Sequence, residues 1–114
     1  MTRASQALGR FGEDVVTRWY QQRGWTVVER NFRCARGEVD IIAQLGTTVV
    51  FCEVKTRTSA RFGDGAEAVG YRRQQRLRAA AVVWLLAQEL SLRSLRFDVA
   101  CVSHGKVTML EGAF

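Results

Sequence analysis

Two stretches of the sequence decide the fold, GEVDIIA at residues 37–43 and VFCEVKTR at residues 50–57. Both are rich in valine, isoleucine or phenylalanine, which favour strands, and they predict strands at 38–44 and 49–56. The short glycine-containing segment 45–47 separates them, and a loop of this length joins antiparallel strands in a hairpin. We therefore expect the two strands to lie side by side.

Two acids and a lysine are expected to meet on this hairpin. Side chains alternate along a strand, so Glu53 and Lys55 share one face, and the short turn brings Asp40 alongside Glu53. Carboxylate oxygens suit Mg²⁺ or Mn²⁺, and a divalent ion offsets the charge that develops when a phosphodiester is hydrolysed. Lys55 could orient the attacking water or stabilise the pentavalent phosphate. The alternative is a solvated cross-strand ion pair, but both acids interrupt apolar strands, where an unpaired charge is costly.

The rest of the chain predicts helices and strands around the hairpin. Apolar residues recur at helical spacing near the N-terminus and again in the second half, and strand-like segments flank the hairpin and end the chain. The expected helices are 5–22 and 67–90, and the further strands are 25–30, 95–102 and 106–110. This order, α-β-β-β-α-β-β, predicts a single α/β domain over the whole chain, residues 1–114, with a mixed central sheet flanked by helices.

The composition favours a polyanionic partner. With 17 Lys and Arg against 11 Asp and Glu, the chain has a net charge of +6, and its pI is about 10.0. Nucleic acid, DNA in particular, fits this charge, although a merely basic surface has the same composition. The basic residues expected to grip phosphates beside the acidic cluster are Arg57, Arg61, Arg72 and Arg76.

The sequence also predicts a cytoplasmic protein without a membrane partner. Its longest apolar run, residues 79–87, is far shorter than the roughly 20 residues that span a bilayer. The N-terminus lacks the continuous apolar stretch of a secretory signal. The cysteines Cys34, Cys52 and Cys101 have no C-x-x-C spacing, which predicts free thiols rather than a zinc site.

The two quoted strands resemble the paired strands of the PD-(D/E)XK nuclease superfamily, which includes restriction enzymes and archaeal Holliday-junction resolvases. More narrowly, the chain resembles the YraN-like family of bacterial proteins. This likeness extends to Gly12-Glu13 in the first helix, Phe62-Gly63 in a loop, and the Arg-Phe-Asp-Val of residues 96–99 in a late strand. The resemblance implies a restriction endonuclease-like fold of three layers.

The resemblance implies roles for individual residues as well. Asp40 and Glu53 would bind the metal, Mg²⁺ or Mn²⁺, and Lys55 would be catalytic. Apart from the resemblance, Glu38 shares the face of Asp40 and is expected to line the mouth of the site. Asp98, in a late strand, is expected to be a structural ion-pair partner.

Three positions on the helices complete the expected site. Glu13 matches the acid that resolvases add from their first helix, and the neighbouring Gly9 and Gly12 would let that helix approach closely. An ordinary surface acid is the equal alternative for Glu13. Many relatives carry a lysine and then a glutamine where this chain has Arg73 and Gln74. Arginine offers a planar fork that suits phosphate, so we expect Arg73 to contact a nucleic-acid backbone and Gln74 to support the site.

Three functions are open from the sequence. The first is a metal-dependent DNA endonuclease, with branched or recombination intermediates as substrates by analogy with resolvases. The second is a nucleic-acid-binding module that keeps the fold with little or no turnover, and the third is an interaction protein. Intact Asp40, Glu53 and Lys55 favour the nuclease. We also expect a homodimer, because one chain presents one site and a duplex has two strands to cut.

Overall fold

The computed structural model describes residues 3–57, 69–89 and 94–114 of the chain. Its elements follow the predicted order α-β-β-β-α-β-β. They are α1 (Arg3–Gln22), β1 (Thr26–Cys34), β2 (Gly37–Leu45), β3 (Thr48–Arg57), α2 (Tyr71–Leu86), β4 (Ser94–Ser103) and β5 (Lys106–Leu110).

The five strands form one mixed sheet in the spatial order β1-β2-β3-β4-β5. Neighbouring strands are antiparallel except for β3 and β4, which run parallel. A parallel pair needs a crossover connection, and α2 lies in that connection. The sheet is therefore mixed, as the order of elements predicted.

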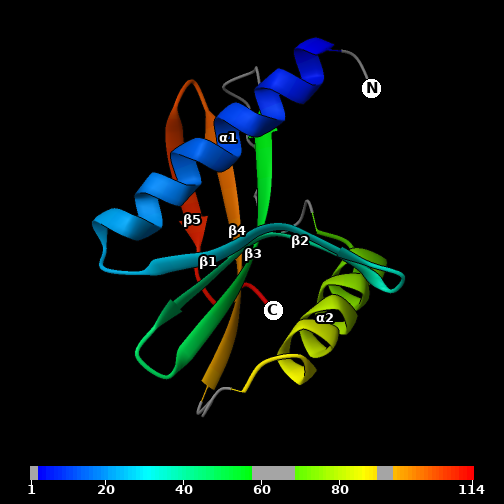
Figure 1. Cartoon of the computed structure of the whole chain (residues 1–114). Helices are drawn as coiled ribbons and strands as arrows, with labels where there is room; N and C mark the ends of the chain where they lie inside the picture. The colour runs from blue at the N-terminus through cyan, green and yellow to red at the C-terminus, as the bar shows by residue number, and fades with distance from the viewer. Residues whose placement is uncertain (1–2, 58–68, 90–93) are drawn as a thin grey trace.

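The two helices cover opposite faces of the sheet (Figure 1). On the α1 face, Val16 and Tyr20 are fully buried in one core cluster with Val50 of β3. On the α2 face, the ring of Trp84 meets the ring of Phe51 edge to face at 5.9 Å. Val50 and Phe51 are neighbours in the chain and point to opposite faces, as strand geometry requires. The predicted three-layer arrangement of helix, sheet and helix is confirmed.

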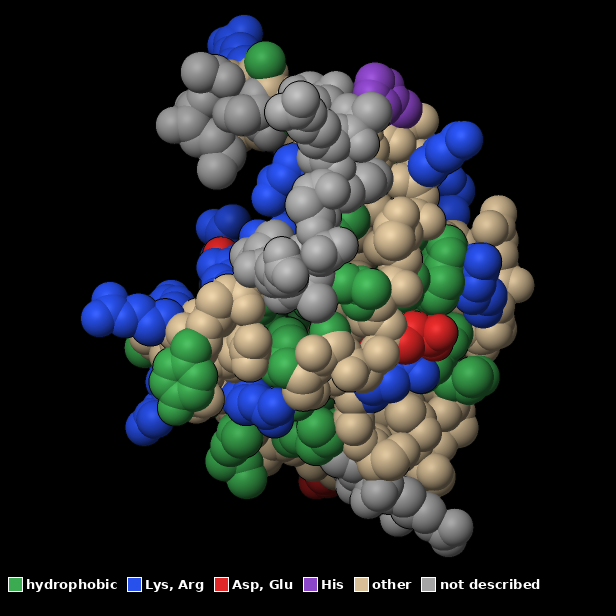
Figure 2. Space-filling model, turned by 180° about the vertical axis from the view of Figure 1, so that it is seen from behind, with side chains coloured by type: hydrophobic (Ala, Val, Ile, Leu, Met, Phe, Trp, Pro, Cys, Tyr) green, Lys and Arg blue, Asp and Glu red, His purple; other side chains and the backbone are tan. Residues whose placement is uncertain are grey.

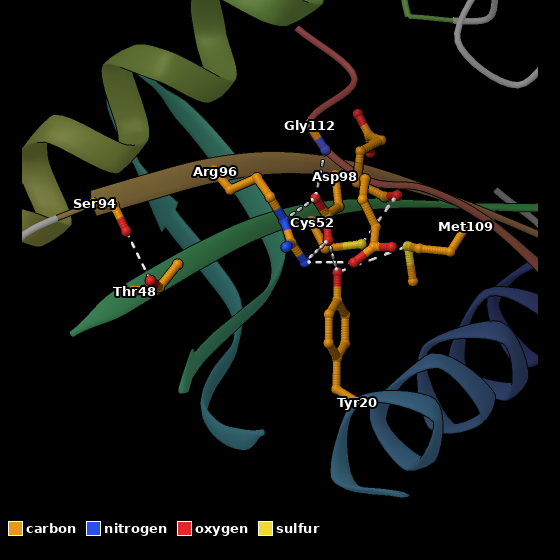
Figure 3. A network of polar contacts seen from close by, with 10 residues as sticks. Tyr20, Thr48, Cys52, Ser94, Arg96, Asp98, Met109 and Gly112 are labelled. Atoms are coloured by element: carbon orange, nitrogen blue, oxygen red, sulfur yellow. Dashed lines mark hydrogen bonds and ion pairs between the residues drawn. The ribbon is translucent and has the colours of Figure 1, made fainter. Parts of the chain in front are cut away.

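A buried polar network ties α1 to β4 and to the end of the chain (Figure 3). Asp98 of β4 is fully buried and accepts two hydrogen bonds from Arg96, at 2.8 and 3.0 Å. It also accepts one from the Tyr20 hydroxyl at 2.7 Å and one from the backbone N–H of Gly112 at 3.0 Å. The expectation that Asp98 is a structural ion-pair partner is confirmed.

β1 is longer than predicted. The sequence pattern ended the strand at residue 30, whereas β1 continues to Cys34, with Phe32 opposite Val39 of β2. Asn31, in the middle of this strand, has a φ of 53°, a positive value that asparagine adopts more readily than most residues. The polar segment 29–31 and this irregular backbone interrupt the alternation on which the prediction depended.

α2 is shorter than the predicted helix 67–90. It begins at Tyr71 and ends at Leu86, and the predicted positions 67, 68 and 90 lie outside the described residues. Val69 was expected in the apolar stripe of this helix. It is buried, but it lies in a bend before the helix, where its carbonyl accepts a hydrogen bond from the side chain of Gln74 at 3.0 Å. A buried apolar residue just before a helix can fit the helical spacing of apolar residues, so the sequence does not distinguish it from a residue inside the helix.

The cysteines Cys34, Cys52 and Cys101 form no disulfide bond, and Cys52 and Cys101 are buried. Within the described ranges, neither helix is long and apolar enough to span a bilayer.

Candidate active site

The site lies where β2 and β3 separate, which we call the strand fork. These strands pair from Leu45 opposite Thr48 only as far as Ile41 opposite Cys52. Beyond that point β2 stays with β1, and β3 stays with β4 as far as Arg57. Figure 1 shows β2 turning away from β3 on the side where α2 packs. Backbone groups of β2 and β3 beyond this point therefore have no partner on the other strand of the hairpin.

Asp40 and Glu53 occupy the first positions past the last pair of the hairpin. A side-chain oxygen of Asp40 accepts a hydrogen bond of 2.8 Å from the backbone N–H of Val54 and so satisfies a donor that the ladder leaves unpaired. Glu53 is almost completely buried, with 4% of its surface exposed. The predicted meeting of the two acids across the hairpin is therefore present.

The two carboxyl groups have pKa values shifted in opposite directions. Burial, and then the neighbouring Glu53, raise the pKa of Asp40 to about 8, although the hydrogen bond from Val54 opposes the shift. Burial also raises the pKa of Glu53, but hydrogen bonds from Arg73 and then from Asp40 outweigh it and place that pKa below its ordinary value. The pKa of Asp40 therefore lies above that of Glu53, so Asp40 is the carboxyl group of the pair that holds a proton more strongly.

Arg73 of α2 donates hydrogen bonds to both oxygens of the Glu53 carboxylate. Its Nη2 donates to Oε1 of Glu53 at 2.9 Å, its Nε donates to Oε2, and Nη2 also reaches Oε1 of Glu38 at 3.3 Å. The hydrogen bond to Glu53 raises the pKa of Arg73 above its ordinary value. The sequence placed Arg73 on a nucleic-acid backbone and did not predict this ion pair. A signal was present, because a buried acid on an apolar strand requires a cation.

Lys55 lies on the same face of β3 as Glu53, as predicted. It is half-buried, and its positive charge contributes to the lowered pKa of Glu53. An ammonium group so close to the paired acids can interact with a bound phosphate or water in the fork.

Glu13 reaches the same region from α1. Its side chain accepts a hydrogen bond from Nδ2 of Asn31 at 3.0 Å, and its negative charge adds to the raised pKa of Asp40. A Cβ atom at Gly12 would overlap the side chain of Thr56, so this glycine lets α1 lie directly on β3, whereas Gly9 faces open space. The close approach predicted for Gly12 is confirmed. Asn31 was not predicted, because its strand was not.

A cleft of about 470 Å³ lies between α1 and the β1–β2 hairpin, and Asp40 is one of the residues that line it. Acids and cations both line it. The lining residues are Gln6, Gly9, Arg10, Glu13, Asn31, Arg33, Glu38 and Asp40. Glu38 is at the mouth of the site, as expected, and pairs with Arg33 at 3.4 Å. Neither Arg10 nor Arg33 was among the predicted phosphate contacts, because Arg10 is far from the hairpin in sequence and Arg33 lies beyond the predicted strand 25–30.

The other predicted binding residues have mixed positions. Arg57, Arg72 and Arg76 are exposed, at the end of β3 and the start of α2. The amide of Gln74 is bonded to the carbonyl of Val69. Arg61 lies outside the described residues. In the view from behind Figure 1, basic side chains lie on both sides of the molecule, including the side where α2 lies, with few acidic ones in sight (Figure 2).

The donor chemistry at the fork fits a hard divalent cation. Asp40 and Glu53 offer carboxylate oxygens of the kind that Mg²⁺ and Mn²⁺ prefer. Burial and the nearby charge of Glu53 raise the pKa of Asp40, and a bound cation would offset both effects. Among the described residues, however, no three acidic, histidine or cysteine side chains gather closely enough to hold an ion by themselves. Water and phosphate oxygens would therefore complete the coordination of an ion held by these two carboxylates.

Fold and site together define a mixed α/β protein with two coupled carboxyl groups and a lysine at a strand fork. The chain belongs to the uncharacterised protein family UPF0102, whose sequence pattern matches residues 12–102. This match confirms the resemblance to the YraN-like family, and the matched residues include all of the fork.

Members of this family match most of the chain. A protein from Frankia alni is 45% identical over 98% of each chain. One from Beutenbergia cavernae is 47% identical over 88% of this chain and 85% of its own, and one from Rhodococcus opacus is 41% identical over 92% and 91%. Their names give the family alone.

Proposed function

We propose that this protein is a metal-dependent endonuclease of the PD-(D/E)XK superfamily with a restriction endonuclease-like fold. The observation that carries the proposal is the pair of neighbouring carboxyl groups, Asp40 and Glu53, at the strand fork, with Lys55 on the same face of β3 as Glu53. A structural role requires no such crowding, since a single buried ion pair would satisfy the sheet. Crowded acids that give up a proton to a cation are common at catalytic sites.

Asp40 and Glu53 would hold Mg²⁺ or Mn²⁺ through their side-chain oxygens. The ion supplies positive charge to the phosphate oxygens as the phosphodiester bond breaks. Arg73 already uses both oxygens of Glu53, so a bound ion would share or take over one of them. Glu13, at the wall of the cleft beside Asp40, could accept a hydrogen bond from a water of the ion.

Lys55 would act on the reacting groups rather than on the ion, because like charges repel. Its ammonium group can orient the attacking water or stabilise the negative charge on the phosphate. The exposed Arg57, Arg72 and Arg76 would hold neighbouring phosphates of the substrate. DNA is the proposed substrate, with branched DNA the preferred form by analogy with resolvases. In the bacterial cytoplasm, where DNA is found, the three free thiols would stay reduced.

One observation favours a nucleic-acid-binding module instead. Arg73 neutralises Glu53 in a two-pronged contact, so the fork is satisfied without an ion. A module that only bound nucleic acid could keep this arrangement permanently.

A cleavage panel separates the two functions. Linear duplex, single-stranded, flap and four-way-junction DNA would be incubated with Mg²⁺ or Mn²⁺ and either the wild type or Asp40→Asn. We expect cleavage of at least one substrate by the wild type, and none by Asp40→Asn or in chelator. Tight binding without cleavage of any substrate would favour the module.

A further inference from the structure

A second groove lies on the other flank of α1, away from the acidic cleft. Phe11, Val15, Arg18 and Gln22 recur every three or four residues and so form one side of the helix. They line a groove of about 560 Å³ together with the turn between β4 and β5. Glu13 and the acidic cleft lie on the opposite side of the same helix. We call this second groove the flank groove.

The flank groove combines exposed aromatic surface with positive charge. Phe11 is 47% exposed, so a ligand in the groove can reach its ring. The guanidinium group of Arg23 lies over the ring of Trp19, with its central carbon 3.8 Å from the ring centre. Every charged side chain among the described residues that line the groove is a cation, namely Arg18, Arg23 and Lys106.

We propose that the flank groove binds a single-stranded segment of nucleic acid. Bases would stack on the exposed ring of Phe11 and on the Trp19–Arg23 pair, since both aromatic rings and guanidinium planes accept a base. Phosphates would pair with Arg18 and Lys106. A paired duplex keeps its bases inside and cannot use such a surface, so the flank groove distinguishes unpaired from paired strands.

This inference deepens the proposed function, because it gives the same protein a contact for the unpaired strand of its substrate. A chain with a net charge of +6 attracts any polyanion. The aromatic rings are what point to a single strand. A purely electrostatic patch for duplex DNA needs no exposed phenylalanine.

The test uses the full-length Asp40→Asn protein in chelator, so that neither cleavage nor metal affects binding. Fluorescence anisotropy would measure its affinity for labelled oligothymidylate and oligouridylate, whose comparison tells DNA from RNA, and binding of either supports the inference. Adding Phe11→Ala should weaken single-strand binding by about tenfold, through loss of one stacked base. Leu45→Ala is the matched control, because Leu45 is 46% exposed and lies at the end of β2, outside the groove.

A second variant tests the charge. Lys106 is exposed, so Lys106→Gln should leave the fold intact. It should also reduce the slope of log affinity against log salt by about 0.7, the value for one phosphate contact to a single strand. Arg36→Gln removes an exposed charge elsewhere and should leave the slope unchanged. In addition, quenching of tryptophan fluorescence by oligothymidylate should be lost in Trp19→Phe.

Two results would overturn the inference. The first is unchanged affinity for both oligonucleotides in Phe11→Ala and Lys106→Gln. The second is a halved molecular mass in Phe11→Ala with unchanged binding, which would assign the groove to a second copy of the chain. This test gives a result that is independent of the proposed function. Single-strand binding in the groove without cleavage of any substrate would support the inference and contradict the nuclease proposal.

Discussion

At the scale of single residues, the charge of Asp40 depends on what lies beside it. Without an ion, burial and Glu53 keep it protonated up to a pKa of about 8. A metal ion requires the ionised form, so proton and metal compete for the same oxygens. The ordinary pKa of an aspartate is far lower, and the unfolded chain therefore loses this proton at acidic pH.

We predict that affinity for Mn²⁺ rises with pH by about tenfold per unit until it levels off near the Asp40 pKa of about 8. Titration calorimetry at several values between pH 6 and 9 would measure this, and Glu29→Gln, an exposed acid, is the control. An affinity that is flat over this range would mean that Asp40 does not release a proton to the ion.

The metal-free protein should lose stability as pH rises from about 4 to about 8, because the unfolded state gives up the Asp40 proton first. Asp40→Asn should remove that dependence and gain on the order of 2 kcal/mol at pH 8. The asparagine amide can still donate to Glu53, and its oxygen can still accept from Val54. Denaturant unfolding in chelator is the measurement. Equal stability of the two proteins at pH 8 would contradict the proton assignment.

Arg73 makes the opposite contribution through Glu53, whose pKa is lowered. Its stabilisation is present above the ordinary pKa of a glutamate and is lost as pH falls. Arg73→Gln should therefore cost about 1–3 kcal/mol in chelator at neutral pH and almost nothing in acid. Mn²⁺ should stabilise this variant more than the wild type, since the ion replaces the missing charge. A loss that is the same at both pH values would indicate lost packing only.

The proximity of Asp40, Glu53 and Lys55 could be predicted from the sequence, because strand alternation and a short turn determine which residues face one another in a hairpin. The ion pair between Arg73 and Glu53 could not be predicted in the same way. It depends on how α2 lies across the sheet, and that orientation is set by packing between segments far apart in the chain. Asn31 was missed for a related reason, because its positive φ interrupts a strand.

At the scale of elements, the position of α1 decides whether Glu13 reaches the fork. Two contacts fix the position of α1, namely the close packing of Gly12 against Thr56 and the hydrogen bond from the Tyr20 hydroxyl to Asp98. On the other face, a Cβ atom at Gly37 would overlap the backbone carbonyl of Arg76, so this glycine brings α2 against β2. The periodic pattern predicted that both helices exist. It could not predict where α2 begins, since Val69 is buried outside the helix.

We predict that Asp98→Ala costs about 3–5 kcal/mol of unfolding free energy, because it leaves Arg96 and Tyr20 without their buried partner. Glu111→Ala is the matched control. Glu111 pairs with the same arginine at 3.1 Å, but its side chain is 58% exposed, so its removal should cost at most about 1 kcal/mol. Thermal and denaturant unfolding would measure both. An equal loss of unfolding free energy in the two variants would mean that the burial of Asp98 does not determine how much the network stabilises the fold.

At the scale of the whole molecule, the paired acids Asp40 and Glu53 lie at the fork, and exposed cations lie at the end of β3 and the start of α2. This separation suits a polyanion whose phosphates bind around a metal site. Since each chain has one fork, a symmetric pair of chains would be needed to cut both strands of a duplex. The homodimer stays a prediction.

Duplex DNA should bind with an affinity that falls steeply with salt. Arg72→Gln should reduce the slope of log affinity against log salt by about 0.9, the value for one phosphate contact to B-DNA. Arg36→Gln should leave it unchanged. An unaltered slope in both variants would place the duplex away from α2.

The central claim is that Asp40 and Glu53 form a metal site, and titration calorimetry with Mn²⁺ at pH 8 tests it most directly. The account predicts saturable binding to the wild type, loss of binding in Asp40→Asn, and retained binding in Lys55→Ala, which loses cleavage only. If the wild type binds no divalent ion, with or without DNA, the nuclease proposal is wrong and the binding module takes its place.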